Sequence, residues 1–292
     1  MRIKILIGII TILLLLTGCG IITGLGIIKT EEKITYCSPN ITIASFNIRK
    51  FSDTSRNDEE LDKITEVLKQ FDLIAVQEII GDVKILNRTV EMLAKKGKKY
   101  NFVVSEPMGN VQKERYAFLF NKKLTLVGKP KIYYDKYDKF IREPYFASFK
   151  SGEFDFDIFT VHILYGDNAY DREPEMRQIA NVYSYYQEKN PEENDLILTG
   201  DFNTRPWDDN FDYIWAIPNV KVVIRDGEST IGKYGNLYDN IIFTESSTQE
   251  YTGLNRIYTF DKILELEQEE ARNKVSDHRP VYAVFCTGED DD

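Results

Sequence analysis

After the N-terminal segment, the order of apolar and polar residues fits first a strand, then a helix, and then a second strand and helix. Residues 41–47 alternate with a period of two, and residues 57–71 place apolar side chains at helical spacing behind an acidic first turn. Residues 72–78 are apolar until their final two residues, as in a buried strand, and residues 83–96 form an amphipathic helical pattern that Gly97 closes. The sequence therefore predicts two consecutive strand–helix units.

After residue 100 the pattern changes to strand upon strand. We expect strands at residues 101–105, 115–121, 124–134, 145–150 and 154–164, a helix at 171–188, a strand at 195–199, short strands near Val220, Ile241 and Tyr258, and a closing strand at 280–285. Strands outnumber helices by about two to one, and the helices fall early and midway. This mixture predicts an α+β fold, a two-sheet β-sandwich flanked by helices in four α/β/β/α layers, rather than a barrel.

The first thirty residues differ from the rest. Arg2 and Lys4 precede an almost unbroken apolar run at residues 5–16, which is typical of a secretory signal. The run ends in Leu-Thr-Gly-Cys at residues 16–19, which resembles a bacterial lipobox, in which Cys19 is lipidated and becomes the new N-terminus. We therefore interpret residues 1–18 as a lipoprotein-type signal peptide.

An uncleaved membrane anchor is the alternative for this segment. Residues 20–28 are also apolar, and the combined stretch reaches the roughly 20 residues needed to cross a bilayer. Under both interpretations residues 19–37 form an anchor and linker, and the folded domain at residues 38–287 lies outside the cytoplasmic membrane. We expect a lipid-anchored protein at the cell membrane or outer membrane.

Composition narrows the class of protein. The chain has 292 residues, of which 42% are hydrophobic and 29% charged, so it can bury a full core and is neither disordered nor a multi-span membrane protein. Its net charge of -10 argues against a broad basic face for polyanions, so a phosphate-bearing substrate must be held by local groups. Residues 288–292 are expected to be a solvated acidic tail.

Three cysteines bear on the compartment. Apart from Cys19, Cys37 precedes the first predicted strand and Cys286 follows the last. An oxidising compartment permits a disulfide between them, and their spacing alone fits two free thiols equally well. No Cys-x-x-Cys motif or Cys/His cluster indicates zinc.

Polar groups gather where buried strands begin or end. The only two histidines, His162 and His278, stand at such points, after residues 158–161 and just before Pro280. Carboxylates and amides stand at four further strand ends: Asn47; Gln77 and Glu78; Asp201 and Asn203; Asp239 and Asn240. Acids at the ends of buried strands are costly unless they are paired or bind a cation.

These groups suit one kind of chemistry. Carboxylate and amide oxygens favour Mg²⁺, with Mn²⁺ or Ca²⁺ as alternatives. A divalent cation with two imidazoles suits phosphodiester hydrolysis, because a base must activate water and the leaving oxygen needs a proton or a cation. Each histidine would need a carboxylate to fix its tautomer.

Eight short segments together resemble the motif series of the endonuclease/exonuclease/phosphatase superfamily, deoxyribonuclease I-like branch. They are Phe46-Asn47-Ile48-Arg49, Gln77-Glu78, Glu114-Arg115-Tyr116, Arg142-Glu143-Pro144, Thr160-Val161-His162, Gly200-Asp201-Phe202-Asn203, Tyr238-Asp239 and Ser276-Asp277-His278-Arg279-Pro280. They occur in the family's order between residues 41 and 285. The resemblance implies a two-sheet sandwich, which agrees with the strand pattern.

The resemblance also implies a metal site and a general base. Glu78 would bind the catalytic divalent ion with Asn47 beside it, and Asp277 would lie close to the metal and the phosphate. His278 would be the general base that activates water, oriented by Asp239.

The remaining implied roles concern the leaving group and the phosphate. His162, paired with Glu114, would protonate the leaving oxygen or stabilise the phosphoryl charge. Asp201 and Asn203 would position the attacking water and the scissile phosphate, and Arg142 would contact a phosphate oxygen.

Three departures from the vertebrate-type enzyme concern how the substrate is held. Ile80 stands where that enzyme has an Arg used in the DNA minor groove, and Gln112 stands where it has a Tyr. A Cys pair that bridges the loop after Gly-Asp-Phe-Asn is missing, with Asn236 near the second position, so we expect a freer loop. If the first and last strands run antiparallel with Asn47 near His278, their far ends bring Cys37 and Cys286 together.

The leading hypothesis is a membrane-anchored, metal-dependent endonuclease that cuts DNA outside the cell, as a monomer. Binding would depend on local cations, namely Arg49, Lys50, Arg142 and Arg205, and would weaken with salt. A sphingomyelinase-like or other phosphoesterase of the same superfamily is the second hypothesis, and an inactive surface binding protein is the third.

Overall fold

The computed structural model describes residues 34–110, 112–189, 194–290 and 292. The predicted signal peptide, Cys19 and most of the anchor lie outside these residues. Within the described part of the chain, no helix is long and apolar enough to cross a membrane.

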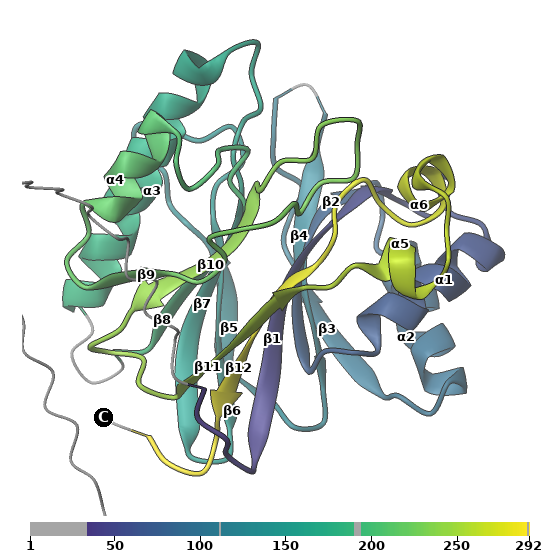
Figure 1. The fold of residues 1–292 in the computed structure, drawn as a ribbon, viewed down its shortest axis with the longest axis horizontal. Helices are drawn as coiled ribbons and strands as arrows, with labels where there is room; N and C mark the ends of the chain where they lie inside the picture. Colours follow the sequence, from purple (N-terminus) through teal and green to yellow (C-terminus); the bar gives the residue numbers. More distant parts are fainter. Residues whose placement is uncertain (1–33, 111, 190–193, 291) are drawn as a thin grey trace, which may run out of the picture. The chain divides into compact units, whose positions relative to one another are not determined.

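Two six-stranded sheets form the centre of the fold (Figure 1). The first has the order β11-β12-β1-β2-β4-β3, with bounds Tyr251–Ile257, Val281–Cys286, Asn40–Phe51, Leu73–Ile80, Glu114–Asn121 and Tyr100–Val104. The second has the order β5-β6-β7-β8-β10-β9, with bounds Thr125–Ile132, Tyr145–Ser151, Phe154–His162, Leu196–Asp201, Asp239–Thr244 and Val220–Val222. Aromatic side chains such as Phe118, Phe149 and Phe243 fill the core between the sheets.

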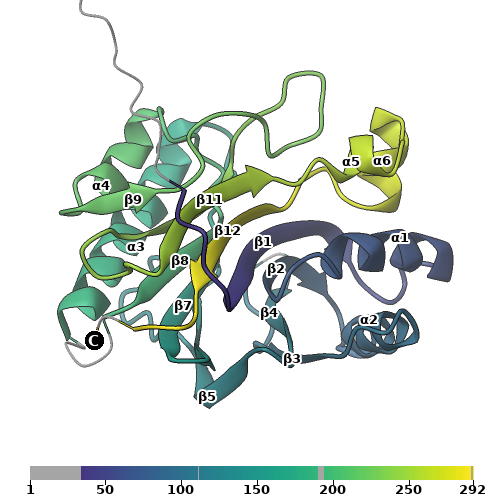
Figure 2. The same ribbon diagram turned by 60° about the horizontal axis from the view of Figure 1, so that its bottom comes forward.

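Helices cover the outer face of each sheet (Figure 2). The first sheet packs against α1 (Asp58–Leu68), α2 (Lys84–Lys95), α5 (Phe260–Ile263) and α6 (Gln268–Lys274). The second sheet packs against α3 (Ala169–Lys189) and α4 (Asp212–Trp215), next to a 3₁₀ turn at Asp209–Phe211. The predicted sandwich with helices on both outer sides is therefore confirmed.

Parallel strand pairs at the middle of each sheet bring chemistry to one end of the fold. β1 and β2 run parallel around the α1 crossover, with Asn47 opposite Gln77. β7 and β8 run parallel around the α3 crossover, with His162 opposite Asp201. Because the carboxyl ends of parallel strands lie at the same edge, four of the predicted polar strand ends meet there.

Two of these strands continue beyond the residues predicted to end them. β1 runs to Phe51 and β2 to Ile80, and the pairing register shifts between Asn47 and Phe51. At this irregularity Glu78 has φ of 62°, in the left-handed region. A bulge of this kind re-aims a side chain, and here it presents the Glu78 carboxylate at the sheet edge.

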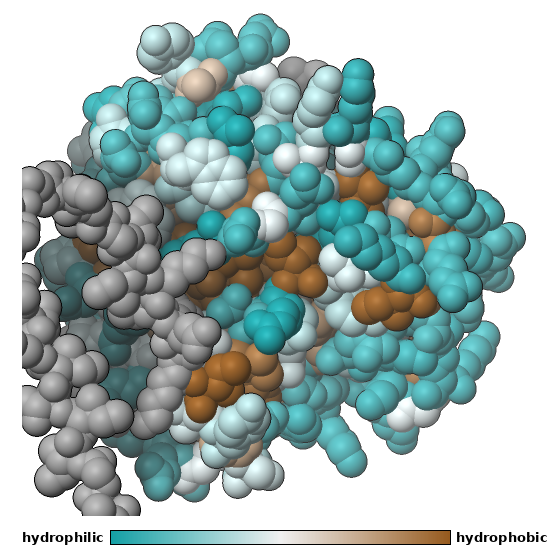
Figure 3. Space-filling view, in the orientation of Figure 1, coloured by the Kyte–Doolittle hydropathy of each residue, from teal (hydrophilic) through white to brown (hydrophobic). Residues whose placement is uncertain are grey.

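Most apolar side chains of the described residues are buried in three hydrophobic core clusters. On the face drawn in Figure 3, hydrophilic residues predominate, and hydrophobic ones show in patches between them.

The short helices α4, α5 and α6 were not predicted from the sequence. In α6 only Ala271 is buried, so its sequence carries almost no apolar period.

In the acidic end of the chain Gly288, Glu289 and Asp292 are exposed, as expected of a solvated tail, and two carboxylates also contact the domain. A carboxylate oxygen of Asp290 accepts a hydrogen bond from the Asp155 backbone N–H at 3.1 Å, and one of Asp292 accepts from the Asn194 N–H at 2.8 Å. These residues therefore contact the domain, because their carboxylates satisfy backbone donors that would otherwise need water.

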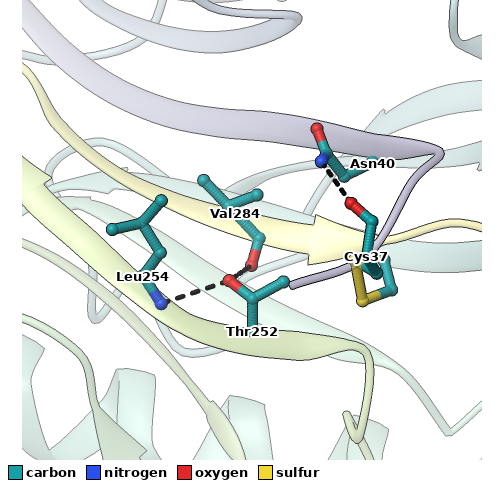
Figure 4. Close-up of a disulfide and its surroundings, with 6 residues drawn as sticks. Cys37, Asn40, Thr252, Leu254 and Val284 are labelled. Carbon is teal, nitrogen blue, oxygen red and sulfur yellow. Dashed lines mark hydrogen bonds between the residues drawn. A yellow bond between two sulfur atoms is a disulfide. The ribbon is translucent and has the colours of Figure 1, made fainter. Parts of the chain in front are cut away.

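A disulfide joins Cys37 to Cys286 (Figure 4). β1 and β12 run antiparallel, with Asn40 opposite Cys286, so the segment before β1 reaches the end of β12. The Asn40 side chain donates a hydrogen bond to the Cys37 carbonyl at 2.8 Å, and Thr252 donates to the Val284 carbonyl at 2.9 Å. The disulfide thus ties the start of the domain to its last strand.

Removing this disulfide is expected to destabilise the protein. Cys286→Ser should lower the free energy of unfolding by about 2–5 kcal/mol, because the unfolded chain gains the freedom of a long open loop. Urea denaturation of residues 30–292 measures this value. A reductant should lower the stability of the wild type by a similar amount and leave the variant unchanged, and equal stability of the two proteins would contradict the prediction.

Candidate active site

Each histidine of the chain pairs with a carboxylate. His162, at the end of β7, lies with Nδ1 2.9 Å from Glu114 Oε2 at the start of β4. His278, just before β12, lies with Nδ1 2.7 Å from Asp239 Oδ2 at the start of β10. Because each Nδ1 is taken up by a carboxylate, each Nε2 is left to face the cleft that both histidines line.

Both rings face a third carboxylate, Asp201. The Nε2 atoms of His162 and His278 each lie 3.6 Å from Asp201 Oδ2. Burial of Asp201 would raise its pKa, but the charges of the two imidazoles hold the pKa below its usual value. The two histidines therefore lie on one site, although 116 residues of sequence separate them.

The first pair is held on several sides. Arg142 donates from Nε and Nη2 to the His162 carbonyl, at 3.1 and 3.0 Å, and its Nη1 lies 3.5 Å from Glu114 Oε1. Tyr116 accepts the His162 backbone N–H at 2.8 Å. Burial would raise the pKa of Glu114, but the hydrogen bond and charge of His162, with the charge of Arg142, lower it. Arg142 lines the same cleft as the two histidines and also anchors this pair.

The second pair depends on two serines. Ser229 donates from Oγ to Asp239 Oδ2 at 2.7 Å, which orients the carboxylate toward His278. Ser276 accepts the His278 backbone N–H at 3.1 Å and donates to the Asn47 carbonyl at 2.7 Å. The second serine links the histidine segment to β1, so the pair is fixed relative to the first sheet.

Asn47 joins the predicted metal ligand to the centre of the site. Its Nδ2 donates to Glu78 Oε1 at 3.2 Å and to Asp201 Oδ2 at 3.0 Å. The Lys50 N–H donates to Glu78 Oε2 at 2.9 Å. Asn47 Oδ1 is buried without a hydrogen-bond partner, which is costly for an amide oxygen and fits a site for a cation.

Asp277 and Asn203 line the same cleft as the two histidines. Asp277 Oδ2 lies 3.7 Å from Arg49 Nε. Asn203 has φ of 48° and donates its backbone N–H to Asp201 Oδ1 at 2.9 Å and its Nδ2 to the Ile163 carbonyl at 2.8 Å. The catalytic, phosphate-binding and metal-binding residues named from the sequence are thus gathered around one cleft, either in its lining or directly behind it.

A second group of side chains is compatible with a metal ion. Asp201, Asp239 and His278 offer ligand atoms within 4.8 Å of one another, and Asp239 Oδ1 is buried without a hydrogen-bond partner. This group differs from the predicted ligands Glu78, Asn47 and Asp277. A cation bound there would compete with the hydrogen bond between His278 and Asp239. His278 would then be a metal ligand, whereas it stays paired with Asp239 if the cation binds at Glu78.

Known proteins that are similar to this chain identify its family. Residues 44–278 match the sequence profile described as the Endonuclease/Exonuclease/phosphatase family. The chain belongs to this family. A deoxyribonuclease from Thioalkalivibrio sp. (strain K90mix) is 31% identical over 261 residues, which cover 84% of this chain and 71% of that protein. Human deoxyribonuclease gamma is 30% identical over 267 residues, covering 82% of this chain and 84% of that protein.

These relatives place the chain in the deoxyribonuclease I-like branch of the family. Among solved structures, truncated Caenorhabditis elegans TDP2 has a TM-score of 0.60 at 13% identity and covers 85% of this chain and 97% of its own. A family protein from Bacteroides thetaiotaomicron has a TM-score of 0.56 at 16% identity and covers 84% and 98%. These two structures share the fold of this family member.

Several supporting residues were missed by the sequence reasoning. Ser229 gave no signal, because a serine in a loop has many uses, whereas Ser276 stood in a quoted motif without being given a role. Arg272 of α6 lines the cleft, but it lies in a helix that the sequence pattern did not reveal. Tyr116 did have a signal, since it directly follows Glu114 and Arg115 in a quoted motif.

The loop before β10, which we expected to be freer without a cysteine pair, has hydrogen bonds at Asn236. The backbone N–H groups of Ser229 and Thr230 both donate to the Asn236 carbonyl at 2.9 Å, and the Asn236 N–H donates to Thr230 Oγ1 at 2.8 Å. Hydrogen bonds at Asn236 therefore close this part of the loop without a cysteine pair.

The charge of His278 is expected to make stability depend on pH. Burial would lower its pKa, but Asp239 and Asp201 outweigh burial and raise the pKa to about 10. A raised pKa in the folded state stabilises the fold fully below the unfolded value of about 6.5, and this contribution is lost as the pH rises toward 10. In metal-free buffer, the stability difference between wild type and His278→Gln should shrink between pH 6.5 and 10. Denaturant titrations across this range measure it, and a constant difference would contradict the assignment.

Proposed function

We propose that this protein is a metal-dependent, deoxyribonuclease-like endonuclease that hydrolyses phosphodiester bonds in DNA. Membership of the family and the relatives named deoxyribonuclease support a hydrolase acting on phosphodiester bonds. The observation that carries the proposal is the approach of both Nε2 atoms to Asp201 at 3.6 Å. Two imidazoles on one cleft provide the two proton-transfer groups that hydrolysis needs.

In this proposal the two pairs have different roles. In the metal-free protein burial is outweighed by Asp239 and Asp201, which raise the pKa of His278, and a cation bound beside them would lower it and favour the neutral ring. The neutral His278 takes a proton from water through Nε2, while Asp239 fixes its tautomer and balances the charge that it gains. His162, held by Glu114, gives a proton to the leaving oxygen. Asp201 stabilises whichever imidazole is charged, because its carboxylate faces both rings.

The metal would be held by Glu78 and Asn47. Their oxygens are the hard ligands that Mg²⁺ prefers, and Asn47 Oδ1 is a buried acceptor without a hydrogen-bond partner. When bound, the cation would polarise a phosphate oxygen and stabilise the negative charge of the transition state. Arg142 is proposed as a phosphate contact from the cleft wall, where it is already held by the His162 carbonyl.

The proposed grip on DNA is local and weak. Arg49 lies beside the cleft, with Nε 3.7 Å from Oδ2 of the cleft residue Asp277, and Lys50 next to it in the sequence is exposed. Arg205 is taken up by Asp208, with Nη2 2.7 Å from Oδ1, so its charge is partly balanced within the protein. With a net charge of -10, this arrangement favours sequence-tolerant binding that weakens with salt.

We also propose that the protein is a monomer and that it lies outside the cytoplasmic membrane, held there by lipidated Cys19 or by an apolar anchor. The disulfide between Cys37 and Cys286 supports an oxidising compartment, because such bonds persist mainly outside the cytosol.

The deciding experiment incubates residues 30–292 with supercoiled plasmid and with circular single-stranded DNA, in Mg²⁺ with and without a chelator. The expected result is nicking or linearisation that the chelator prevents. Intact DNA together with cleavage of a choline phospholipid would replace the nuclease by the second hypothesis. Intact DNA and intact lipid would favour a surface binding protein.

A further inference from the structure

The loop between β9 and β10 carries an exposed aromatic ring to the catalytic cleft. The base of this loop is fixed to the catalytic segment, because the Ile231 N–H donates to the Asp277 carbonyl at 2.7 Å and Thr230 pairs with His278. Beyond this base the chain extends outward from the strands (Figure 2). Tyr234 near the tip is 77% exposed, lines the cleft, and has Lys233 Nζ 5.2 Å from its ring.

A second ring lines the same cleft just after β7. Tyr165 is 58% exposed and packs edge to face against Tyr238, with ring centroids 6.5 Å apart. The guanidinium of Arg172 lies 4.8 Å from the Tyr165 ring, and its Nε donates to the Tyr165 carbonyl at 2.7 Å. Both cleft rings therefore combine an open aromatic surface with a cation, and both belong to segments fixed next to a catalytic histidine.

An aromatic ring beside a cation suits a nucleobase next to its phosphate. Bases stack on exposed aromatic rings regardless of sequence, and the cation can attract the neighbouring phosphate. Inside a duplex the faces of a base are covered by its neighbours, so a ring at the scissile phosphate can stack only on a base that has left the helix. The net charge of -10 also gives a duplex backbone little to bind.

We propose that Tyr165 and Tyr234 each stack on an unpaired base flanking the scissile phosphate, so that the preferred substrate is single-stranded or locally unpaired DNA. This assignment rests on the proposed nuclease function. The two tyrosines act as substrate-positioning residues, because their rings bind bases while the histidines carry out proton transfer. The stacking surface, rather than the hydroxyl, is the part of each tyrosine that matters.

The test uses single-stranded oligonucleotides with one cleavable phosphate, all other linkages being phosphorothioates. Thymidines or abasic nucleotides flank the cleavable phosphate, and kcat/KM is measured for each substrate with residues 30–292 and Mg²⁺. For the wild type, each base lost should lower kcat/KM by about 5- to 150-fold. A fully paired duplex containing the same thymidines should be cut more slowly than the single strand.

The ratio of kcat/KM for the thymidine and abasic substrates isolates stacking from folding and chemistry. This ratio should fall toward one in Tyr165→Leu and Tyr234→Leu, and should keep its wild-type value in Tyr165→Phe and Tyr234→Phe. Tyr185→Leu is the matched control: Tyr185 is 54% exposed with Lys189 5.2 Å from its ring, but it does not line the cleft. Its ratio should be unchanged.

Two results would overturn the assignment in distinguishable ways. A wild type that cuts thymidine and abasic substrates equally fast excludes base stacking and leaves the proposed nuclease function standing. A wild type that cuts neither substrate, nor plasmid, removes the proposed function and this assignment together.

Discussion

Replacing His278 or His162 with alanine is expected to lower DNA cleavage by about 10²- to 10⁴-fold each, the range usual for loss of a general acid or base. The geometry explains why neither ring can replace the other. Each is bound through Nδ1 to its own carboxylate, Asp239 or Glu114, and reaches Asp201 only through Nε2. Rates of plasmid nicking under saturating Mg²⁺ measure the loss.

The double variant provides the internal check on this expectation. If the two imidazoles act in the same catalytic step, His162→Ala with His278→Ala should lose far less than the product of the two single losses. Because the cavity left by a buried ring lowers stability, thermal unfolding is needed to separate a loss of fold from a loss of activity. We expect each variant still to fold. A folded single variant that retains full activity would refute the proton-transfer roles.

The sequence predicted the larger elements of the fold because their apolar residues follow a clear period. α1 is an example: Leu61, Ile64 and Leu68 are buried on one face, and Asn57 and Glu60 form a capping box at its start. The sequence did not predict α5 and α6, whose few buried residues, such as Phe260 and Ala271, are too widely spaced to show a period.

The sequence predicted the chemical groups of the candidate site, but it predicted fewer of the residues that hold those groups in place. The histidine–carboxylate pairs came from motifs that lie at strand ends, and strand ends meet where the sheets pack. The convergence of both rings on Asp201, the bulge that turns Glu78 and the serine beside Asp239 depend on contacts between segments far apart in sequence. Such contacts leave no local pattern, so only the folded chain reveals them.

Loss of the Glu78 carboxylate is the other change with a large expected effect. Glu78→Gln keeps the shape of the side chain but removes its charge, so Mg²⁺ should bind more weakly and cleavage should fall at least about a hundredfold. Glu91→Gln is the matched control, because Glu91 is an exposed residue of α2 outside the cleft. Its activity should equal that of the wild type.

Metal binding can be measured without relying on activity, and this separates the two placements of the cation. Mg²⁺ at 100 times its dissociation constant stabilises the folded state by about 2.7 kcal/mol, a rise in melting temperature of roughly 5–10 °C for a domain of this size. Glu78→Gln should lose most of this rise, and Asp239→Asn should keep it, because Asp239 is committed to His278. The opposite result would move the cation to the cluster of Asp201, Asp239 and His278, and His278 would then be a ligand rather than a base.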